Sequence, residues 1–587
     1  MIRTHNCNEL RTEHIGEEVV LAGWINTIRD HGGVLFIDLR DHYGVTQIVI
    51  HDDSLLADVT KETVISAKGI VKKRDEDTLN TKIETGYIEV HADSIEVLGP
   101  CLNSLPFEVD ESTKTREDLR LKYRYLDLRN PKIHKNIVLR SKMLSFMRAQ
   151  MEQLGFMEIQ TPILTASSPE GARDYLVPSR KHKGKFYALP QAPQQFKQLL
   201  MASGFDKYFQ IAPCFRDEDA RQDRSPGEFY QLDFEMAFAT QEDVFDVAET
   251  VIYNTFNEFS DKKISKPPFK RITFADAMLK YGTDKPDLRN PLIISDLTDF
   301  FAKNEFLTIN DRTVPFKNKP VRGIVANYLD MAEGKKAFEK DIDTYSRSIG
   351  MKFGVGYITL DNGEYKGPIA KFLTEEQKAE LTELVGIKDG ESLFFISDTP
   401  AVVDHLAGEM RTWIGTKLGL IDESSFEFCF IVDFPMYEYN DETKKIDFTH
   451  NPFSMPQGGM DALLNKDPLE IFAYQYDIVC NGVELSSGAV RNHNPEIMRK
   501  AFEIAGYGED TLKEKFGALY NAFAFGAPPH AGMAPGVDRM VMLIAGEETI
   551  RDVIAFPLNG NAQDLMMGAP GTVTQQQLRD VHIKIRD

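Results

Sequence analysis

Hydrophobic and polar residues alternate in short runs over the first 107 positions of this chain of 587 residues. Such alternation predicts half-buried β-strands, and turn-forming pairs such as Gly32-Gly33 and Thr85-Gly86 fall between the runs. The predicted strands are Val19–Ile25, Val34–Leu39, Val45–Ile50, Thr63–Val71, Tyr87–Val90 and Ser94–Val97. Five or six strands in about 100 residues favour a small closed barrel of the OB type, a fold that commonly binds oligonucleotides.

Two side chains of this predicted barrel suit the recognition of single-stranded nucleic acid. Phe36 and Gln47 fall on neighbouring strands, where an aromatic ring that stacks a base would lie beside an amide that reads a base edge. Aromatic residues in strands are also common core residues, so packing of Phe36 inside the barrel is the alternative.

A long amphipathic helix follows a basic, polar stretch at 108–133 that we interpret as a linker. The helix is predicted to begin near Pro131 and to end at Gly155, and a short strand at Met157–Gln160 ends at Thr161-Pro162. The apolar stripe of the helix consists of Ile137, Leu144, Met147, Met151 and Leu154. This stripe fits either a dimer interface or burial within the domain that contains the helix.

Residues 287–420 differ in character from both flanks, because they lack the chemical constellations described below. They alternate strands (Gly356–Leu360, Ser392–Ser397) with helices (Glu375–Val385, Val402–Leu418). The predicted fold class is therefore multidomain α+β. Its parts are a barrel (1–107), a linker (108–133), the first part of a large domain (134–286), an inserted α+β module (287–420) and the second part of that domain (421–587).

Charge is distributed unevenly along the chain. The net charge is −22, yet the stretch from Lys114 to Lys142 is strongly basic, and a second basic group lies at 180–185. Local fields of this kind favour phosphate binding, whereas net charge bears mainly on solubility. Solvated surface charge is the alternative interpretation.

The cysteines and the apolar segments indicate the compartment. The chain contains five scattered cysteines and no C-x-x-C pair, which favours a reducing compartment over a disulfide scaffold or a zinc ribbon: Cys7, Cys101, Cys214, Cys429 and Cys480. The N-terminal residues show no apolar signal region, and no run approaches the ~18 apolar residues of a membrane span. We expect a cytoplasmic protein that does not insert into a membrane.

Two arginine-bearing segments more than 300 residues apart carry the most specific chemical signal. In Phe215-Arg216-Asp217-Glu218, the guanidinium can bind a phosphate through two parallel hydrogen bonds, and Phe229 can return on the next strand to stack an adenine. Gly536-Val537-Asp538-Arg539 stands at a predicted strand-to-helix junction, where free amides favour anions. An ATP site built without a Gly-Lys-Ser/Thr loop indicates adenylate transfer, and a hairpin with a charged tip is the alternative at Arg216.

A predicted hairpin offers a magnesium site. Asp477 and Glu484 flank Asn481-Gly482, a pair that favours a tight turn and would bring the two carboxylates together. Two carboxylates together with substrate phosphates commonly bind Mg²⁺, although carboxylates that flank hairpins are also common on surfaces. Arg491 follows the small residues Ser486-Ser487-Gly488, which leave space for an anionic ligand.

These segments resemble motifs of the class II aminoacyl-tRNA synthetases. Pro162 after the long helix, the Arg216 segment with Phe229, and Gly536-Val537-Asp538-Arg539 look like motifs 1, 2 and 3. Further segments are similar to those of the bacterial-type aspartyl enzymes of subclass IIb: Pro169–Tyr175, Gln194–Gln198, His450–Phe453 and Arg551–Pro557. The resemblance spans essentially the whole chain, in the right order of parts.

The resemblance implies an aspartate–tRNA ligase that uses ATP and Mg²⁺ and forms a homodimer through motif 1. It implies a six-stranded antiparallel catalytic sheet in 134–286 and 421–587, an anticodon-binding OB-fold in 1–107 and a GAD-type module in 287–420. L-aspartate would react with ATP to give aspartyl-adenylate and pyrophosphate. The aspartyl group would then pass to the 3′ end of tRNA(Asp), with tRNA(Asn) as a further candidate.

The resemblance also implies roles for individual residues. Arg216, Glu218 and Arg539 would be catalytic, and Asp477 and Glu484 would hold magnesium. The residues implied for ATP are Arg216, Asp217, Glu218, Ser225, Phe229, Glu484, Gly536, Val537, Asp538 and Arg539. Those implied for aspartate are Glu170, Gln194, Lys197, Arg216, Asp233, His450 and Arg491, and those for the anticodon are Arg29, His31, Phe36 and Gln47.

Some positions depart from the pattern of the family. Ala192 stands where many relatives have serine, and the loop at Ser225-Pro226-Gly227 is one residue longer than usual, which puts the contact of Ser225 in question. His31 lies near the position of the anticodon in relatives, where it either relaxes discrimination between tRNA(Asp) and tRNA(Asn) or caps a turn. The competing interpretations are a sister synthetase for asparagine or lysine, and a paralogue that only binds RNA.

Overall fold

The computed structural model describes residues 2–56, 59–167, 172–221, 227–303, 308–309, 312–313, 316, 319–328, 335–351, 354–440 and 443–586. The chain divides into two compact units, Met1–Glu108 and Val109–Asp587. Among the described helices, none combines the length and the apolar character that a bilayer crossing requires.

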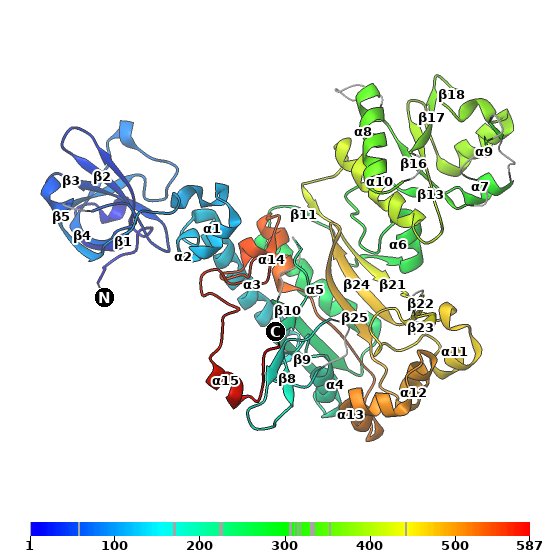
Figure 1. Cartoon of the computed structure of the whole chain (residues 1–587). Coiled ribbons are helices and arrows are strands. Elements are labelled where there is room, and N and C mark those ends of the chain that lie inside the picture. The colour runs from blue at the N-terminus through cyan, green and yellow to red at the C-terminus, as the bar shows by residue number, and fades with distance from the viewer. Residues whose placement is uncertain are drawn as a thin grey trace. The chain divides into compact units, whose positions relative to one another are not determined.

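Unit 1 is a closed barrel with the strand order β1-β2-β3-β5-β4 (Figure 1), as the alternation predicted. Its strands are β1 (Glu18–Asp30), β2 (Leu35–Arg40), β3 (Val45–Ile50), β4 (Val64–Lys73) and β5 (Ile88–Gly99). The two strands predicted between 87 and 97 form the single strand β5. A register shift in its pairing with β4 lets the strand continue through the residues that break the alternation. Inward side chains such as Leu21, Ile37 and Ile65 are fully buried.

From Val109 onward, the stretch interpreted as a linker is mostly helical and belongs to unit 2. It forms η4 (Val109–Lys114), α1 (Glu117–Lys122), α2 (Arg124–Asp127) and the start of α3 (Pro131–Gln153). Arg124 is 2% exposed and donates to main-chain carbonyls between residues 551 and 555. Asp127 accepts hydrogen bonds from Arg120 and Arg124. Part of the basic charge that suggested a solvated or phosphate-binding stretch is therefore neutralised inside the protein.

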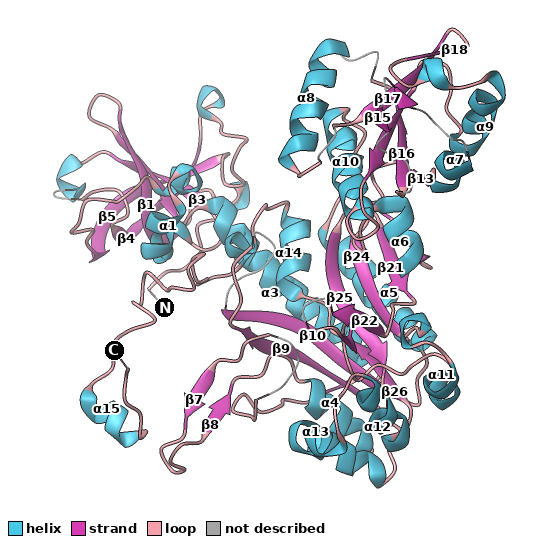
Figure 2. Ribbon diagram, turned by 45° about the vertical axis from the view of Figure 1, so that its right-hand side comes forward, coloured by secondary structure: helices cyan, strands magenta, loops and turns pink. Residues whose placement is uncertain are grey.

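Unit 2 is built on an eight-stranded sheet, drawn in magenta in Figure 2. In spatial order its strands are β12 (Lys270–Thr273), β21 (Phe428–Val432), β24 (Gln475–Cys480), β25 (Val483–Val490), β26 (His530–Met533), β10 (Gly227–Ala237), β9 (Lys207–Arg216) and β6 (Met157–Glu158). The six central strands are antiparallel, and the edge strands β12 and β6 add in parallel. The six-stranded sheet that was expected is thus present, with one further strand at each edge.

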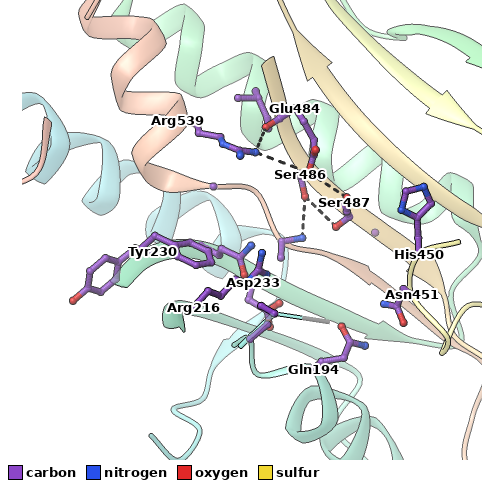
Figure 3. Close-up of a pocket in the computed structure, with 18 of the residues that line it drawn as sticks. Gln194, Arg216, Tyr230, Asp233, His450, Asn451, Glu484, Ser486, Ser487 and Arg539 are labelled. Atoms are coloured by element: carbon purple, nitrogen blue, oxygen red, sulfur yellow. Dashed lines mark hydrogen bonds and ion pairs between the residues drawn. The ribbon is translucent and has the colours of Figure 1, made fainter. Parts of the chain in front are cut away.

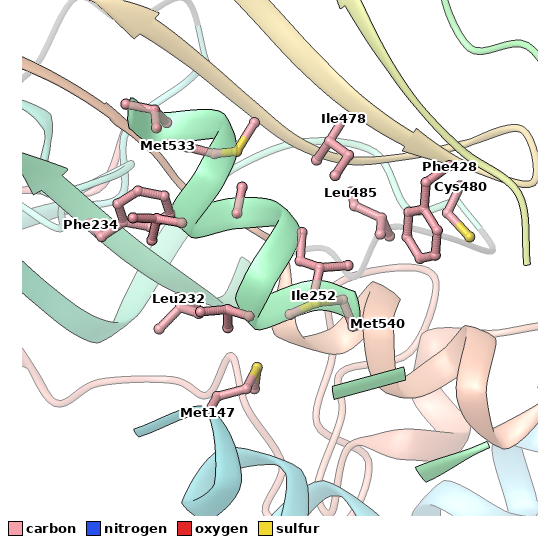
Figure 4. Packing of buried hydrophobic residues seen from close by; sticks show 14 of the residues in the cluster. Met147, Leu232, Phe234, Ile252, Phe428, Ile478, Cys480, Leu485, Met533 and Met540 are labelled. Carbon is pink, nitrogen blue, oxygen red and sulfur yellow. The ribbon is translucent and has the colours of Figure 1, made fainter. Parts of the chain in front are cut away.

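Three helices cover one face of this sheet and form its apolar core (Figure 4). They are α3, α5 (Gln241–Phe259) and α14 (Val537–Ala545). Met147 and Met151 of the predicted stripe of α3 lie in this core, while Ile137 is half-buried. Within unit 2, then, the stripe is used largely for packing inside its own domain.

Strand β10 shows how the sequence separates core from site. Successive side chains of a strand point to opposite faces of the sheet. Leu232, Phe234 and Met236 enter the apolar core. Gln231, Asp233 and Glu235 therefore point to the opposite face, where the candidate site lies.

The inserted stretch holds an antiparallel five-stranded sheet of its own. In spatial order its strands are β13 (Ile294–Asp296), β16 (Val321–Ala326), β19 (Ser392–Ser397), β17 (Gly356–Asp361) and β18 (Glu364–Lys366). Its helices are α7 (Thr298–Lys303), α8 (Lys335–Ser348), α9 (Glu375–Val385) and α10 (Val403–Lys417). Helix α6 (Phe274–Tyr281) leads into it along the chain, and α10 leads out.

Smaller elements complete unit 2. The helices are α4 (Gln194–Ala202), α11 (Gly459–Asn465), α12 (Pro495–Ile504), α13 (Glu509–Ala524) and α15 (Gln575–Asp580). The two-stranded pairs are β7 (Leu176–Pro178) with β8 (Phe186–Ala188), β11 (Lys263–Ile264) with β20 (Ser425–Phe426), β14 (Thr308–Ile309) with β15 (Arg312–Thr313), and β22 (Tyr437–Asn440) with β23 (Lys445–Phe448).

Candidate active site

A cavity of about 400 Å³ opens on the face of the large sheet that is turned away from the apolar core. It brings together many of the residues that the sequence singled out: Gln194, Lys197, Arg216, Glu218, Phe229, Asp233, His450, Glu484, Arg491, Gly536, Asp538 and Arg539. In Figure 3, Arg539 lies beside Glu484 above the cavity, Arg216 and Asp233 lie below them, and His450 lies to the right.

The wall formed by β9 and β10 carries a guanidinium without a complete set of partners. Arg216 ends β9 opposite Gly227 of β10, and its guanidinium carbon lies 5.0 Å from the ring centre of Phe229. The buried Nε of Arg216 has no hydrogen-bond partner among the described residues. A buried donor of this kind is costly unless a ligand satisfies it, so the geometry suits an anion bound by the Arg216 guanidinium.

The opposite wall is the predicted hairpin. Asn481 and Gly482 both have positive φ, 52° and 82°, as a two-residue turn of type I′ requires. The Ser487 hydroxyl lies 2.6 Å from Asp477 and 3.4 Å from Glu484, so it joins the two carboxylates. Burial, reinforced by the negative charge of Glu484, holds the pKa of Asp477 well above its usual range. Two converging acidic side chains, one of them buried with a raised pKa, fit a divalent cation such as Mg²⁺.

Helix α14 supplies the third wall. Gly536 precedes its first turn, and the Gly536 amide donates to the Leu485 carbonyl at 2.7 Å. Arg539 donates to the Glu484 carbonyl at 2.6 Å, and its guanidinium lies 3.9 Å from the Glu484 carboxylate. Arg539 thus lies next to the acidic hairpin, where a terminal phosphate could contact the guanidinium and a cation held by the hairpin.

Asp538, which was expected to bind ATP, makes structural contacts within the protein. It accepts a hydrogen bond from the Tyr230 amide at 2.9 Å and is ion-paired with Arg140 of α3. The carboxylate therefore ties together the three segments that resemble motifs 1, 2 and 3. Val537 is fully buried in the core, so only its main chain is available to a ligand.

Four buried charges form the base of the cavity. Lys197 of α4 lies 2.6 Å from Asp233 and 3.3 Å from Glu235. Arg491 donates to both oxygens of Glu235, at 2.8 Å from Nε and 3.1 Å from Nη2. The lysine and the arginine are each 2% exposed, and both carboxylates are fully buried. We refer to these residues (Lys197, Asp233, Glu235 and Arg491) as the charge quartet.

Glu235 is the site residue whose role the sequence reasoning missed. Lys197, Asp233 and Arg491 were all expected to bind aspartate, but no protein partner was assigned to the arginine. The period of two along β10 places Glu235 on the same face as Asp233, and this was the available signal. Glu235 occupies the edge of the Arg491 guanidinium that carries Nε and Nη2, and Nη2 also lies 3.4 Å from the Gly532 carbonyl, so Nη1 is the donor left for a ligand.

Close packing and charge both maintain the quartet. A Cβ on Gly532 would lie 2.2 Å from Oε2 of Glu235, so only glycine fits beside this carboxylate. Burial raises the pKa of Glu235, but the charges of Arg491 and Lys197 outweigh it and hold the pKa below its usual value. For Asp233, burial outweighs Lys197 and the pKa is raised. Burial also lowers the pKa of the adjacent His530 to about 4, so this imidazole is neutral at physiological pH.

The remaining predicted residues line the cavity, lie next to it or fall outside the described part. Gln194 has a buried Nε2 without a partner among the described residues. Burial lowers the pKa of His450, which favours its neutral form. Ala192 lines the cavity, and Asp217 lies just beyond β9, where its amide donates to the Arg173 carbonyl. Glu170 and Ser225 lie outside the described residues.

The four residues predicted to bind an anticodon are grouped in unit 1. Phe36 is half-buried on the outer face of β2, and its ring meets that of His31 edge-on, with centroids 5.5 Å apart. The Gln47 amide accepts from Arg29 at 3.2 Å and donates to Glu89 at 2.9 Å. Phe36 therefore does not enter the core of the barrel, which was the alternative interpretation of this residue.

Comparison with known proteins identifies both units. The family model "tRNA synthetases class II (D, K and N)" matches residues 116–560, and "OB-fold nucleic acid binding domain" matches residues 19–98. A protein of Ehrlichia canis called aspartate–tRNA(Asp/Asn) ligase is 54% identical over 99% of both chains. A protein of the same name from Erythrobacter litoralis is 56% identical over 99% of this chain and 96% of its own.

Solved structures support the fold. Asparaginyl-tRNA synthetase from Pyrococcus horikoshii, complexed with asparaginyl-adenylate, matches with a TM-score of 0.58 at 18% identity and covers 95% of this chain and 98% of its own. A putative aspartyl-tRNA synthetase from Leishmania major matches with a TM-score of 0.57 at 19% identity, over 94% of each chain. Because a family model covers most of unit 2 and relatives more than half identical cover nearly the whole sequence, the chain belongs to the class II tRNA synthetases (D, K and N).

Proposed function

We propose that this chain is an aspartate–tRNA ligase. The observation that carries the proposal is the pair of buried cations, Lys197 and Arg491, at the base of the cavity whose walls hold Arg216 and Arg539. An oxygen of the aspartate α-carboxylate attacks the α-phosphorus of ATP, the bond to the β-phosphate breaks, and pyrophosphate leaves. A ribose hydroxyl of the tRNA terminus then attacks the activated carbonyl, and AMP leaves.

The residues of the cavity act by position and charge, since no protein nucleophile is required. Arg216 binds the α-phosphate, with Phe229 stacked on the adenine and Glu218 at the adenine end. Arg539 binds the γ-phosphate. Asp477 and Glu484 hold magnesium, which neutralises phosphate charge when it is bound. Gln194 and His450 complete the contacts to aspartate, and Glu170, which lies outside the described residues, stays a prediction for this substrate.

The charge quartet gives a basis for choosing aspartate over asparagine. The two amino acids are similar in shape, but asparagine carries no charge on its side chain. A neutral amide would leave Nη1 of Arg491 and the third proton of Lys197 without an anionic acceptor. A site built to bind a required polar group can discriminate by factors of about 10⁴–10⁵ without an editing step.

We propose that the barrel binds the anticodon through Arg29, His31, Phe36 and Gln47, and that tRNA(Asp) and tRNA(Asn) are both charged. The relatives named aspartate–tRNA(Asp/Asn) ligase support this range. We also propose a cytoplasmic homodimer. Exposed apolar residues near the motif 1 segment, namely Met157, Ile163 and Leu164, support a partner surface there.

Amino-acid-dependent exchange of pyrophosphate into ATP tests the first step. Purified protein is compared with aspartate, asparagine, glutamate and lysine in the absence of RNA. Exchange with aspartate alone is expected. Exchange with asparagine or lysine instead would assign the chain to a sister enzyme, and no exchange with any of them would favour a paralogue that only binds RNA. Charging assays with both tRNAs then test the second step.

A further inference from the structure

A loop outside the motifs brings a lysine to the acidic hairpin. It runs from Gly282, after α6, to Asn290, before β13. The ammonium of Lys285 lies 3.4 Å from Oε2 of Glu484 and 2.9 Å from Oδ2 of Asp284. Its charge also acts on Asp477 and on His450. The lysine is therefore a cation within the electrostatic field of the two carboxylates assigned to magnesium.

The loop is held against the hairpin on one side. A Cβ on Gly482, in the turn between β24 and β25, would lie 3.5 Å from Cβ of Asp287 and 3.8 Å from the Lys285 carbonyl oxygen. A side chain at position 482 would therefore touch the loop, so loop and turn lie close together beside the Lys285–Glu484 ion pair.

Helix α10 of the inserted module holds the loop on the other side. Arg411, 1% exposed, donates to the carbonyls of Asp287 and Asn290 at 3.0 Å and 2.7 Å, and to that of Leu292 at 2.6 Å. A Cβ on Gly282 would lie 2.4 Å from the Gly408 amide nitrogen, so the two backbones touch where both residues are glycine. The last helix of the module therefore holds in place the loop that carries Lys285.

We infer that Lys285 is an internal cation that holds Glu484 while no nucleotide is bound and competes with magnesium for its carboxylate. The inference rests on the proposed function for the identity of the metal. A divalent ion that enters alone must displace the ammonium, so its affinity for the free enzyme is low. The phosphates of ATP add negative charge that favours both cations together, so the metal enters with the nucleotide. Lys285 is a positioning residue, and helix α10 makes the module part of the magnesium site.

Titration with Mn²⁺ in the absence of nucleotide tests the inference, because electron paramagnetic resonance counts the free ion directly. At neutral pH, Lys285→Met is expected to bind Mn²⁺ at the hairpin about tenfold more tightly than the wild type. Lys285→Arg keeps the charge and is expected to stay near the wild-type affinity. Lys280→Met is the matched control, since Lys280 of α6 pairs with Asp276 at 3.2 Å and lies outside the site.

Equal Mn²⁺ affinity of Lys285→Met and the wild type, including no detectable binding to either, would overturn the role of Lys285. Arg411→Gln removes the clamp of α10 and is expected to move the affinity toward that of Lys285→Met. An unchanged affinity would overturn the part of the module. The measurement uses no amino acid and no tRNA, so it decides the inference even if exchange with aspartate fails and the proposed function is wrong.

Discussion

The pair of Arg491 and Glu235 allows the structural and substrate roles of one arginine to be separated. Arg491→Met removes one partner of a buried, bidentate ion pair and leaves Glu235, which is fully buried, with Lys197 at 3.3 Å as its remaining cation. Breaking such a pair costs about 3–5 kcal/mol. The double variant Arg491→Met/Glu235→Met replaces the pair with apolar side chains, and such replacements are often neutral or stabilising.

Two assays separate the two roles, because stability should distinguish the single variant from the double variant, whereas exchange should be lost in both. In calorimetry, the melting temperature of unit 2 should fall by several degrees in the single variant. In the double variant, the free energy of unfolding should return to within about 1 kcal/mol of the wild-type value. In pyrophosphate exchange, both variants should lose about 10²-fold or more in kcat/KM for aspartate, because the donor for the substrate carboxylate is absent from both. ATP binding, measured by equilibrium dialysis, should change by no more than about twofold.

Two results would refute this reasoning. If the single variant is as stable as the wild type, the buried pair does not compensate the charge of Glu235. If the double variant regains exchange together with stability, Arg491 acts only through the fold and does not contact the substrate.

Three further predictions concern His530, Ser487 and Gln47. The pKa of His530 is about 4 in the folded protein and about 6.5 in the unfolded chain. The free energy of unfolding should therefore fall by about 3 kcal/mol as the pH is lowered from 6.5 toward 4. In urea titrations, His530→Gln should flatten this pH dependence. Ser487→Ala removes the hydroxyl that joins Asp477 and Glu484, so half-maximal exchange should need about tenfold more magnesium, and an unchanged magnesium dependence would contradict the shared site. Gln47→Ala should raise the KM for tRNA about tenfold and leave pyrophosphate exchange unaltered, whereas a loss of exchange would mean that the substitution disturbs more than the barrel.

Local signals in the sequence predicted much of the fold. The strand at 392–397 and the helix at 375–385 have the predicted bounds, and the Asn481-Gly482 turn brings Asp477 and Glu484 together. Each of these depends on periodicity or on turn residues within a few positions.

What the sequence could not give depends on distant partners. From the sequence, the arginines at 120 and 124 could be solvated surface charge. In the structure, Arg124 is buried because it donates to carbonyls between residues 551 and 555, more than 420 positions away. Glu235 gains its role only when Arg491, 256 positions away, folds against it. A Cβ at position 532 would exclude that contact, and the sequence around Gly532 gives no sign that glycine is required there.

The pairing of β10 with β26 has a consequence for the synthesis of the protein. Phe234 lies opposite Met533, so strands made about 300 residues apart must meet at the centre of one sheet. At a ribosomal rate of about 5–20 residues per second, the edge of β10 waits roughly 15–60 s for its neighbour. During that interval the edge of β10 is open to other chains, whereas the five strands of the inserted module's sheet already have all their partners. Chains truncated before β26 are therefore expected to aggregate and to depend on chaperones.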